Sequence, residues 1–454
     1  MGRFPRSTAD PVASSARRRS HRPGRPAPVG TGTARRRAVG LLAAVGLLVG
    51  ACSGSSAHKA SGPTGPAGPT SVGAGGVTTG APATNPGPAV RTVPGMPPVV
   101  DPRDIYSEAA AGKLSPAAAN ARPLVYVPDH ATNNITLIDP ATFLVVGVVP
   151  VGLNPQHVIP SWDLTRLWVA NNADGTTRGS LTPIDPVTGK TGANVVVDDP
   201  YNLYFTPDGA YAIVVAEARR RLDFRDPRTM ALKFSIPTPT CLGINHMDFA
   251  IDGSYLIATC EDASRLVKVD WRAQRVIGTL DLGGALPQDI RLSPDGTTFY
   301  VADMAGNRLL LVDGTALGLK GSIDLAATGG YGAHGLYPSR DGTRLYVANR
   351  GSAARTGAPH HGRGSVSVVD FATNRVLANW PVPGGGSPDM GGVNADGTQL
   401  WLSGRFDNEV YVFDTVAGKL AHRIAVGPAG GEPHGLCVWP QPGRYSLGHT
   451  GNMR

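Results

Sequence analysis

The sequence predicts an all-β fold, a seven-bladed β-propeller in which the C-terminal strand completes the first blade. A four-strand pattern recurs seven times at a spacing near 44 residues, with Asp-Gly turns between short β-branched and aromatic runs. One such meander cannot bury both of its faces alone, so each unit needs neighbours like itself. The repeats begin with a second strand and end with a first strand, which favours closure of the ring and leaves no free sheet edge.

The second strand of each unit is the clearest element. Its seven copies are LVYVPD (124–129), RLWVAN (166–171), AIVVAE (212–217), YLIAT (255–259), FYVAD (299–303), LYVAN (345–349) and LWLSG (400–404). The third strand usually ends in Asp, as in Ile138-Asp139 and Val369-Asp370. Short strands at a regular spacing are typical of a propeller.

One polar position stands at the entrance of each inner strand. In blade order from one to seven, the residues are His434, His157, Asn202, His246, Asp289, His334 and Asp389. In sequence order from His157 to His434, the steps between them are 45, 44, 43, 45, 55 and 45 residues. The long step is explained by an insertion in the sixth unit, residues 351–364, which contains His360-His361.

The N-terminal part reads as an export signal and a tether. Residues 1–51 combine an Arg-rich region with a short apolar run, Ala38 to Val49, which is typical of a signal peptide and too short to span a membrane. Residues 52–103 are dominated by Gly, Pro, Ser, Thr and Ala, which predicts a disordered tether. A lead-in segment (104–123), the propeller (124–440) and a C-terminal tail (441–454) follow.

The positive charge of the chain lies in this leader. The net charge is +8, and residues 1–51 hold ten Arg and one Asp, or +9, so the remainder carries 8 − 9 = −1. The folded part therefore offers no electrostatic case for binding nucleic acid.

Two short stretches of the sequence resemble known motifs and add to the expectations for export and for the fold. Val49-Gly50-Ala51-Cys52 resembles the bacterial lipobox, which implies a lipid anchor on Cys52 and an exported protein attached to the cell membrane. The strands LWVAN and LYVAN, with SPDG at 293–296 and IDP at 138–140, resemble the YVTN β-propeller family. That resemblance covers about residues 124–440 and implies the fold, but it does not imply one activity.

Strand order places the inner-strand entrances and the ends of the second strands on one face. A second polar ring is therefore expected there, formed by Asp129, Asn171, Glu217, Thr259, Asp303, Asn349 and Arg405. On the axis, four imidazoles and two carboxylates predict a site for a divalent transition metal, with His157, His246, His334 and His434 as its ligands. The alternative is that these polar residues line a water-filled channel without binding an ion.

A second alternative is enzymatic. Some seven-bladed propellers open lactones with His, Arg and Glu on this face, and Glu217, Arg350, Arg405 and His334 are the corresponding candidates here. The same residues could instead form salt bridges between blades.

Cysteine spacing adds one structural expectation. Cys241 and Cys260 both lie on the same face of one blade, so a disulfide between them suits an exported protein, whereas Cys437 falls inside the closing strand as a buried residue.

From the sequence as a whole we expect a monomeric, lipid-anchored platform that binds a protein partner or a small ligand at the cell envelope. The alternative is a metal-dependent or lactone-hydrolysing enzyme.

Overall fold

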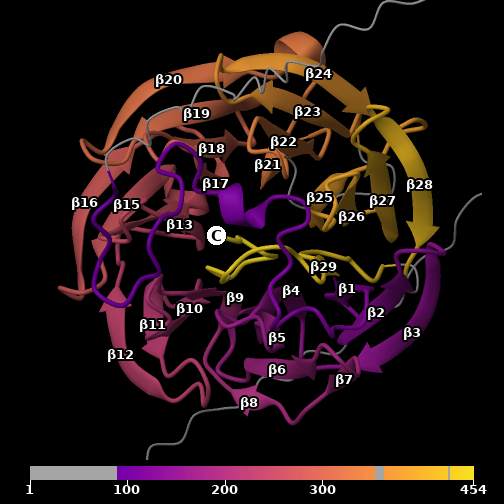
Figure 1. Cartoon of the computed structure of the whole chain (residues 1–454), viewed down its shortest axis with the longest axis horizontal. Helices are drawn as coiled ribbons and strands as arrows, with labels where there is room; N and C mark the ends of the chain where they lie inside the picture. The colour runs from indigo at the N-terminus through magenta and orange to yellow at the C-terminus, as the bar shows by residue number, and fades with distance from the viewer. Residues whose placement is uncertain (1–88, 353–361, 428–429) are drawn as a thin grey trace, which may run out of the picture. The chain divides into compact units, whose positions relative to one another are not determined.

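The structure is a computed structural model that describes residues 89–352, 362–427 and 430–454. They belong to one compact unit, Gly80–Arg454. Seven antiparallel sheets follow one another around a central axis, as Figure 1 shows in the view along that axis. The fold predicted from the sequence is confirmed, including the ring of seven blades.

Blade one is built from both ends of the propeller. Its sheet runs β29 (Cys437–Trp439), β1 (Leu124–Asp129), β2 (Asn134–Asp139) and β3 (Leu144–Pro150). Tyr126 pairs with Cys437 and Leu124 with Trp439, so the C-terminal strand closes the ring as expected. The closing strand is shorter than the 432–440 stretch suggested, although Pro433 still forms an isolated bridge with Asp129.

The other six blades are consecutive in sequence. Blade two contains β4 (Pro155–Pro160), β5 (Leu167–Asn171), β6 (Ser180–Asp185), β7 (Lys190–Thr191) and β8 (Val195–Val196); blade three contains β9 (Pro200–Phe205), β10 (Ala212–Ala216), β11 (Arg221–Arg225) and β12 (Leu232–Pro237); blade four contains β13 (Ile244–Phe249), β14 (Leu256–Cys260), β15 (Arg265–Asp270) and β16 (Arg275–Asp281). Blade five contains β17 (Pro287–Leu292), β18 (Phe299–Asp303), β19 (Arg308–Asp313) and β20 (Gly318–Asp324); blade six contains β21 (Ala333–Pro338), β22 (Arg344–Asn349), β23 (Ser365–Asp370) and β24 (Arg375–Pro381); blade seven contains β25 (Pro388–Val393), β26 (Gln399–Gly404), β27 (Glu409–Asp414) and β28 (Lys419–Ala425).

Helical structure in the described residues is limited to short 3-10 turns. They are η1 (Ser107–Ala109), η2 (Ala173–Gly175), η3 (Glu261–Ala263) and η4 (Ala326–Thr328). No helix among the residues described has the length and apolar character needed to cross a bilayer.

The inner two strands of each blade form the core. The second strands, such as β5 and β10, are fully buried, because their β-branched and aromatic side chains contact the neighbouring blade on both faces. The outer strands alternate, as in β16, where every second residue is exposed. The Asp-Gly hairpins need glycine: Gly296 has a φ of +71°, and a Cβ there would lie 2.6 Å from Ile251 Cδ1.

Part of the predicted tether packs on the propeller. Val93 donates its backbone N–H to Asp252 O, and Arg272 donates to Pro94 O. Val93 and Val99 pack against the apolar clusters of the blades, so the boundary placed at residue 103 from composition lies too far along the chain. Tyr106 of the lead-in segment is buried and donates its hydroxyl to Leu292 O.

Candidate metal centre

The seven polar residues expected at the axis, here called the inner ring, lie within the inner strands or, for His434, just before β29. Six of them have no exposed surface, and His334 is 3 % exposed, so the ring is deeper than the strand entrances where we expected it. In most inner strands the pairing with the second strand shifts register at or next to this position: between Pro155 and His157, Ile244 and Met247, Pro287 and Ile290, Ala333 and Leu336, and Pro388 and Gly391. Such irregularities re-aim side chains and are common near functional sites.

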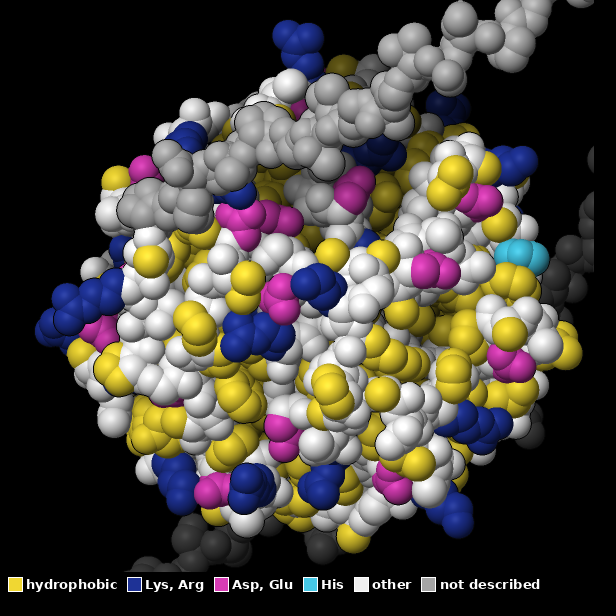
Figure 2. Space-filling view, in the orientation of Figure 1, with side chains coloured by type: hydrophobic (Ala, Val, Ile, Leu, Met, Phe, Trp, Pro, Cys, Tyr) yellow, Lys and Arg dark blue, Asp and Glu magenta, His cyan; other side chains and the backbone are white. Residues whose placement is uncertain are grey.

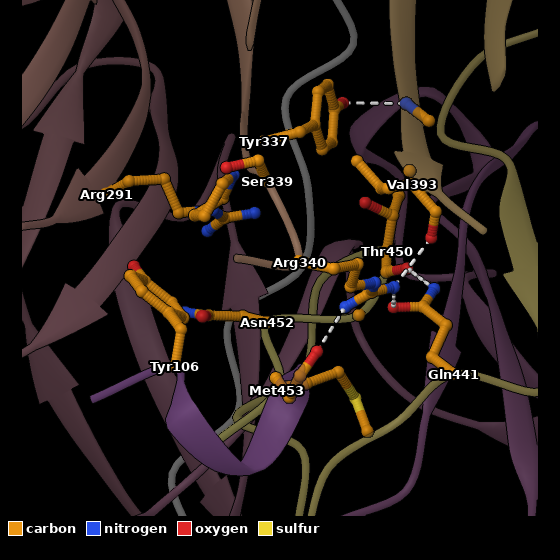
Figure 3. A pocket seen from close by; sticks show the side chains of 15 residues that line it. Tyr106, Arg291, Tyr337, Ser339, Arg340, Val393, Gln441, Thr450, Asn452 and Met453 are labelled. Atoms are coloured by element: carbon orange, nitrogen blue, oxygen red, sulfur yellow. Dashed lines mark hydrogen bonds between the residues drawn. The ribbon is translucent and has the colours of Figure 1, made fainter. Parts of the chain in front are cut away.

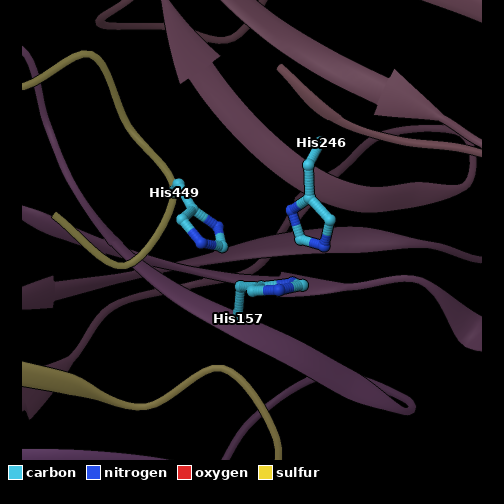
Figure 4. A group of neighbouring side chains, drawn as sticks. All are labelled: His157, His246 and His449. Atoms are coloured by element: carbon cyan, nitrogen blue, oxygen red, sulfur yellow. The ribbon is translucent and has the colours of Figure 1, made fainter. Parts of the chain in front are cut away.

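Three imidazoles meet on the axis and form what we call the three-histidine group (Figure 4). His157 comes from β4, His246 from β13 and His449 from the C-terminal tail. One candidate ligand atom from each lies within 4.8 Å of the others. The ring centroids of His246 and His449 are 4.9 Å apart, and those of His157 and His449 are 5.3 Å apart.

The C-terminal tail delivers His449 by entering the ring. Residues Ser446 and Met453 form a bridge, so the segment between them makes a tight loop. That loop is fastened to β9, because His449 N donates to Leu203 O at 2.9 Å and Phe205 N donates to Leu447 O. Gly448 is required there: its φ is +100°, and a Cβ would lie 2.4 Å from Leu203 O. Figure 1 shows the C-terminus at the centre of the ring.

The sequence did not reveal His449. It lies 15 residues after His434, outside the 44-residue spacing, in a stretch whose sequence indicates only a C-terminal tail. Nothing in its local pattern matches a metal motif. The available signal was indirect: a polar, Gly-containing segment follows the strand that must close the ring.

The hydrogen bonds of the histidines leave one nitrogen of each unused. His157 Nδ1 lies 3.1 Å from Tyr201 O, and His434 Nδ1 lies 3.2 Å from Gln156 O. The Asn202 amide nitrogen lies between His449 Nδ1, at 3.0 Å, and His246 Nδ1, at 3.4 Å. The Nε2 atoms of all four are buried and have no hydrogen-bond partner among the described residues. A ring nitrogen that donates to a carbonyl leaves the other nitrogen able to bind a metal ion, and His157 and His434 have this arrangement. At His246 and His449 the Asn202 amide donates to Nδ1, so an ion at Nε2 requires the ring proton to move to Nδ1 and the amide to turn away.

Burial also sets the charge of these side chains. It lowers the pKa of His157 and His246 well below the ordinary value of 6.5, and the neighbouring His449 lowers both further. The pKa values of His434 and His449 are lowered for the same primary reason. All four are therefore neutral near pH 7, which is the form that binds a metal ion.

A second cluster, here called the carboxylate group, adjoins the first. His334 (β21), Asp389 (β25) and His434 also place one ligand atom each within 4.8 Å of one another. His334 Nδ1 lies 2.8 Å from Asp389 Oδ1, and His434 Nε2 lies 3.5 Å from Asp389 Oδ2. Arg350, predicted as a site residue, is 3 % exposed, and its Nε lies 3.4 Å from Asp389 Oδ1.

Two residues of the inner ring, Asp289 and Asn202, form hydrogen bonds with other groups of the protein. Asp289 accepts backbone N–H groups from Ile290 and from Leu336 of the next blade, each at 2.9 Å. Asn202 accepts from Leu203 N while its amide nitrogen faces two imidazoles. Both residues orient the ring and are poor candidates for direct ligands, because their oxygens are already occupied.

Glu217 and Arg405 occupy the ends of the second strands, as the sequence predicted. Glu217 is half-buried, and burial with the nearby Glu261 raises its pKa to about 8. Arg405 Nη2 lies 3.8 Å from Glu432 Oε2. These two side chains are less buried than the ring beneath them, which places ionisable groups above the histidines.

The opposite end of the channel is closed by structural contacts (Figure 3). A cavity of about 30 Å³ lies there between Tyr106, Arg291, Arg340 and the tail. Arg340 donates to Val393 O at 2.6 Å, to Ala109 O and to Gln441 Oε1, so it joins blade seven, the lead-in segment and the tail. The cavity has room for only a few waters, so we regard it as a small gap between packed segments rather than a binding site.

The remaining predicted residues divide into two sets. Cys241 and Cys260 form a disulfide with Cα atoms 4.8 Å apart, and Cys437 is a buried free thiol. Cys52 and His360-His361 lie outside the described residues.

The surface of the propeller shows no charged patch among the described residues on the face seen in Figure 2, where basic and acidic side chains are interspersed.

Comparison with known proteins identifies a family. A sequence model of the YNCE-like β-propeller family matches residues 81–442. No functionally curated protein matches the chain significantly.

Solved structures add likeness of fold. A functionally unknown protein from Desulfotomaculum acetoxidans is 17% identical with a TM-score of 0.54, and the match covers 70% of this chain and 99% of that one. A candidate 6-phosphogluconolactonase from Bacteroides uniformis is 17% identical with a TM-score of 0.53, covering 69% and 98%. Hydrazine synthase from Kuenenia stuttgartiensis is 17% identical with a TM-score of 0.50, covering 61% and 87%. At this identity the likeness concerns the fold alone.

Proposed function

Because this chain belongs to the YNCE-like β-propeller family, and a fold does not determine an activity, we propose its function from its own axial residues. The protein is an exported, lipid-anchored propeller that binds a transition-metal ion at the three-histidine group. The lipid anchor is Cys52, and the export signal is the Arg-rich leader with its short apolar run. The broader role is that of a ligand-binding platform at the cell envelope.

One observation carries the metal proposal. One ring nitrogen each of the neutral His157, His246 and His449 lies within 4.8 Å of the others. The Nε2 atoms of all three are buried without a hydrogen bond in the described structure, although His449 Nε2 lies 3.6 Å from Asp289 Oδ2. A buried polar atom without a hydrogen bond costs about 1–3 kcal/mol, so a partner shared by the three neighbouring imidazoles would relieve a net cost. A metal ion satisfies all three at once, and imidazole suits copper, zinc, nickel and iron.

The geometry supports hydrolysis of a lactone less well. Of the four candidates for that chemistry, His334 and Arg350 both approach the same buried carboxylate, Asp389. Only Glu217 and Arg405 remain near the channel mouth, and Arg405 lies near Glu432. Those contacts favour an ion-binding centre with supporting charges over a set of groups aimed at a substrate.

The experiment is a thermal-unfolding screen of the full chain with copper, zinc, nickel, manganese and calcium ions. A bound ion should stabilise the parent by about 2.7 kcal/mol at a free concentration one hundred times its Kd. His246→Gln should lose the part of this stabilisation that the three-histidine group contributes. The matched control is His422→Gln, since His422 is exposed and stacks on Phe143 in an outer strand. An unshifted parent, or equal shifts in parent and His246→Gln, would refute the proposal.

A further inference from the structure

We infer that the carboxylate group, His334, Asp389 and His434, is a second metal position, so that the axis holds two neighbouring ions. This inference rests on the proposed function, because it adds an ion beside the one at the three-histidine group. The two groups share no residue, since one draws on blades two and four with the tail and the other on blades six, seven and one. They are adjacent: the ring centroids of His157 and His434 are 4.8 Å apart.

The distances within the carboxylate group can be compared with those expected around a shared ion. Ligand bonds of about 2.0–2.2 Å in a tetrahedral site place two donor atoms roughly 3.4 Å apart. The carboxylate oxygens of Asp389 lie 2.8 Å from His334 Nδ1 and 3.5 Å from His434 Nε2. The second distance matches the expected value, whereas the first is ~0.6 Å shorter, so His334 and Asp389 would move apart slightly on binding an ion. Despite this proximity, neither nitrogen and neither oxygen has a hydrogen bond of acceptable geometry within the described residues. Their alignment is therefore poor for bonding to one another directly.

Arg350 supplies the support that a ligating carboxylate needs. Its Nε lies 3.4 Å from Asp389 Oδ1, and its guanidinium lies 5.0 Å from the centroid of the Phe406 ring. The positive charge of Arg350 beside Asp389 favours the ionised form of this carboxyl group. Metal-bound carboxylates are commonly fixed by such outer partners. Arg350 thus keeps Asp389 ionised while its second oxygen faces His434.

The two positions differ in chemistry. Three neutral imidazoles bring no charge to the first ion, whereas Asp389 brings one negative charge to the second. Two histidines with one carboxylate are the arrangement typical of non-haem ferrous sites, and oxygen ligands are preferred by harder ions. The second position should therefore favour Fe²⁺, Mn²⁺ or Zn²⁺, and the first copper or zinc. The competing explanation is that His334 and Asp389 simply contact one another, at 2.8 Å, with no ion between them.

Stoichiometry separates these cases. The full chain is stripped with chelator, loaded with Zn²⁺, desalted and analysed for zinc per chain, with His422→Gln as the surface control. We expect two zinc ions in the parent and in His422→Gln. One ion should remain in Asp389→Asn, in His334→Gln and in His246→Gln, since each change removes a ligand from one group only. Circular dichroism melting of each apo variant checks that the fold persists, and either carboxylate-group variant suffices if the other fails to fold.

Each outcome decides the question. One ion in the parent that is lost in His246→Gln and kept in His334→Gln would overturn the second position and leave the proposed function standing. One ion lost in His334→Gln and kept in His246→Gln would overturn both the two-ion centre and the three-histidine site. No ion in the parent would overturn both proposals. As a second readout, Cu²⁺ loaded at two adjacent positions should show magnetic coupling in its EPR spectrum, and Asp389→Asn should show an isolated ion.

Discussion

Two polar rings built by the same repeat behave differently. The inner ring places its unpartnered atoms close together, as in the three-histidine group. The ring at the ends of the second strands, here called the strand-end ring, is bonded within its own blades. Its buried members are Asp129, Asn171, Thr259, Asp303 and Asn349. Asn349, for example, donates to Ser365 and Ser367 of the adjacent strand.

The difference shows how one repeat yields both structure and a candidate site. A polar residue at a strand end can bond to the neighbouring strand of its blade, so it stabilises that blade alone. A polar residue of the inner ring also pairs with a strand of its own blade, as His157 does with Ala170, but its side chain contacts equivalent residues of other blades, as His157 does with His246 and His434. Position relative to the axis, more than residue type, therefore separates the two rings.

The largest expected effect concerns the anchor of His449. Arg454 Nη2 lies 2.9 Å from Oδ1 of the fully buried Asp248. Arg454→Ala leaves that carboxylate without its cation, which typically costs about 3–5 kcal/mol. Chemical denaturation should show this loss, and metal analysis should show weaker retention because the tail that carries His449 is loosened.

The matched control is Arg444→Ala in the same tail. The side chain of Arg444 is exposed, and its one hydrogen bond in the described structure goes to Pro98 O, so its loss should stay within about 0.5 kcal/mol. Its backbone hydrogen bond to Arg454 O does not depend on the side chain. Equal stability of the two variants would contradict the role assigned to the Arg454–Asp248 pair.

The next effect sharpens the contrast between the rings. Asp303 accepts from Leu286 N and Gly306 N at 3.0 Å and from Arg308 Nε at 2.8 Å. Asp303→Ala should cost about 3 kcal/mol, because three partly buried hydrogen bonds to a fully buried carboxylate are lost. Bound zinc per chain should be unchanged. The exposed Asp281, changed to Ala, serves as the control, and a loss of zinc in Asp303→Ala would show that the rings are not independent.

The sequence predicted most of this architecture and part of the site. The 44-residue spacing identified His157, His246, His334, Asp389 and His434, because each repeat places one residue at the same point of its inner strand. It could not show that these residues divide into two groups. That division depends on the register shifts that turn individual side chains, such as the one between Ala333 and Leu336.

His449 and the packed part of the tether were missed for a different reason. Both lie outside the repeat, where composition is the main guide. Composition indicates whether a segment can fold by itself. These two segments are instead ordered by contacts with blades that other parts of the chain form. Val93 packs on blades that are built more than a hundred residues later, and His449 bonds to β9 through its backbone.

The smallest effect tests the neutrality of one inner-ring histidine. Burial first, then the nearby His449, lowers the pKa of His246 well below 6.5 in the folded chain. Asn202, Tyr204, His157 and His449 lie around its ring. Between the folded pKa and 6.5 the unfolded chain binds the extra proton, so this histidine makes stability fall as pH decreases below 6.5.

Measured without metal, the parent should therefore lose more stability between pH 7.5 and pH 5.5 than His246→Gln loses. The difference should be about 1.4 kcal/mol, the value of one pH unit for one proton. Comparing the two proteins removes contributions of opposite sign, such as that of Glu217, whose raised pKa of about 8 makes stability fall as pH increases. Chemical denaturation at both pH values, in the presence of chelator, gives the four free energies of unfolding. An identical pH dependence in both proteins would mean that His246 is not held neutral, and a metal ion would then have to displace a proton to bind there.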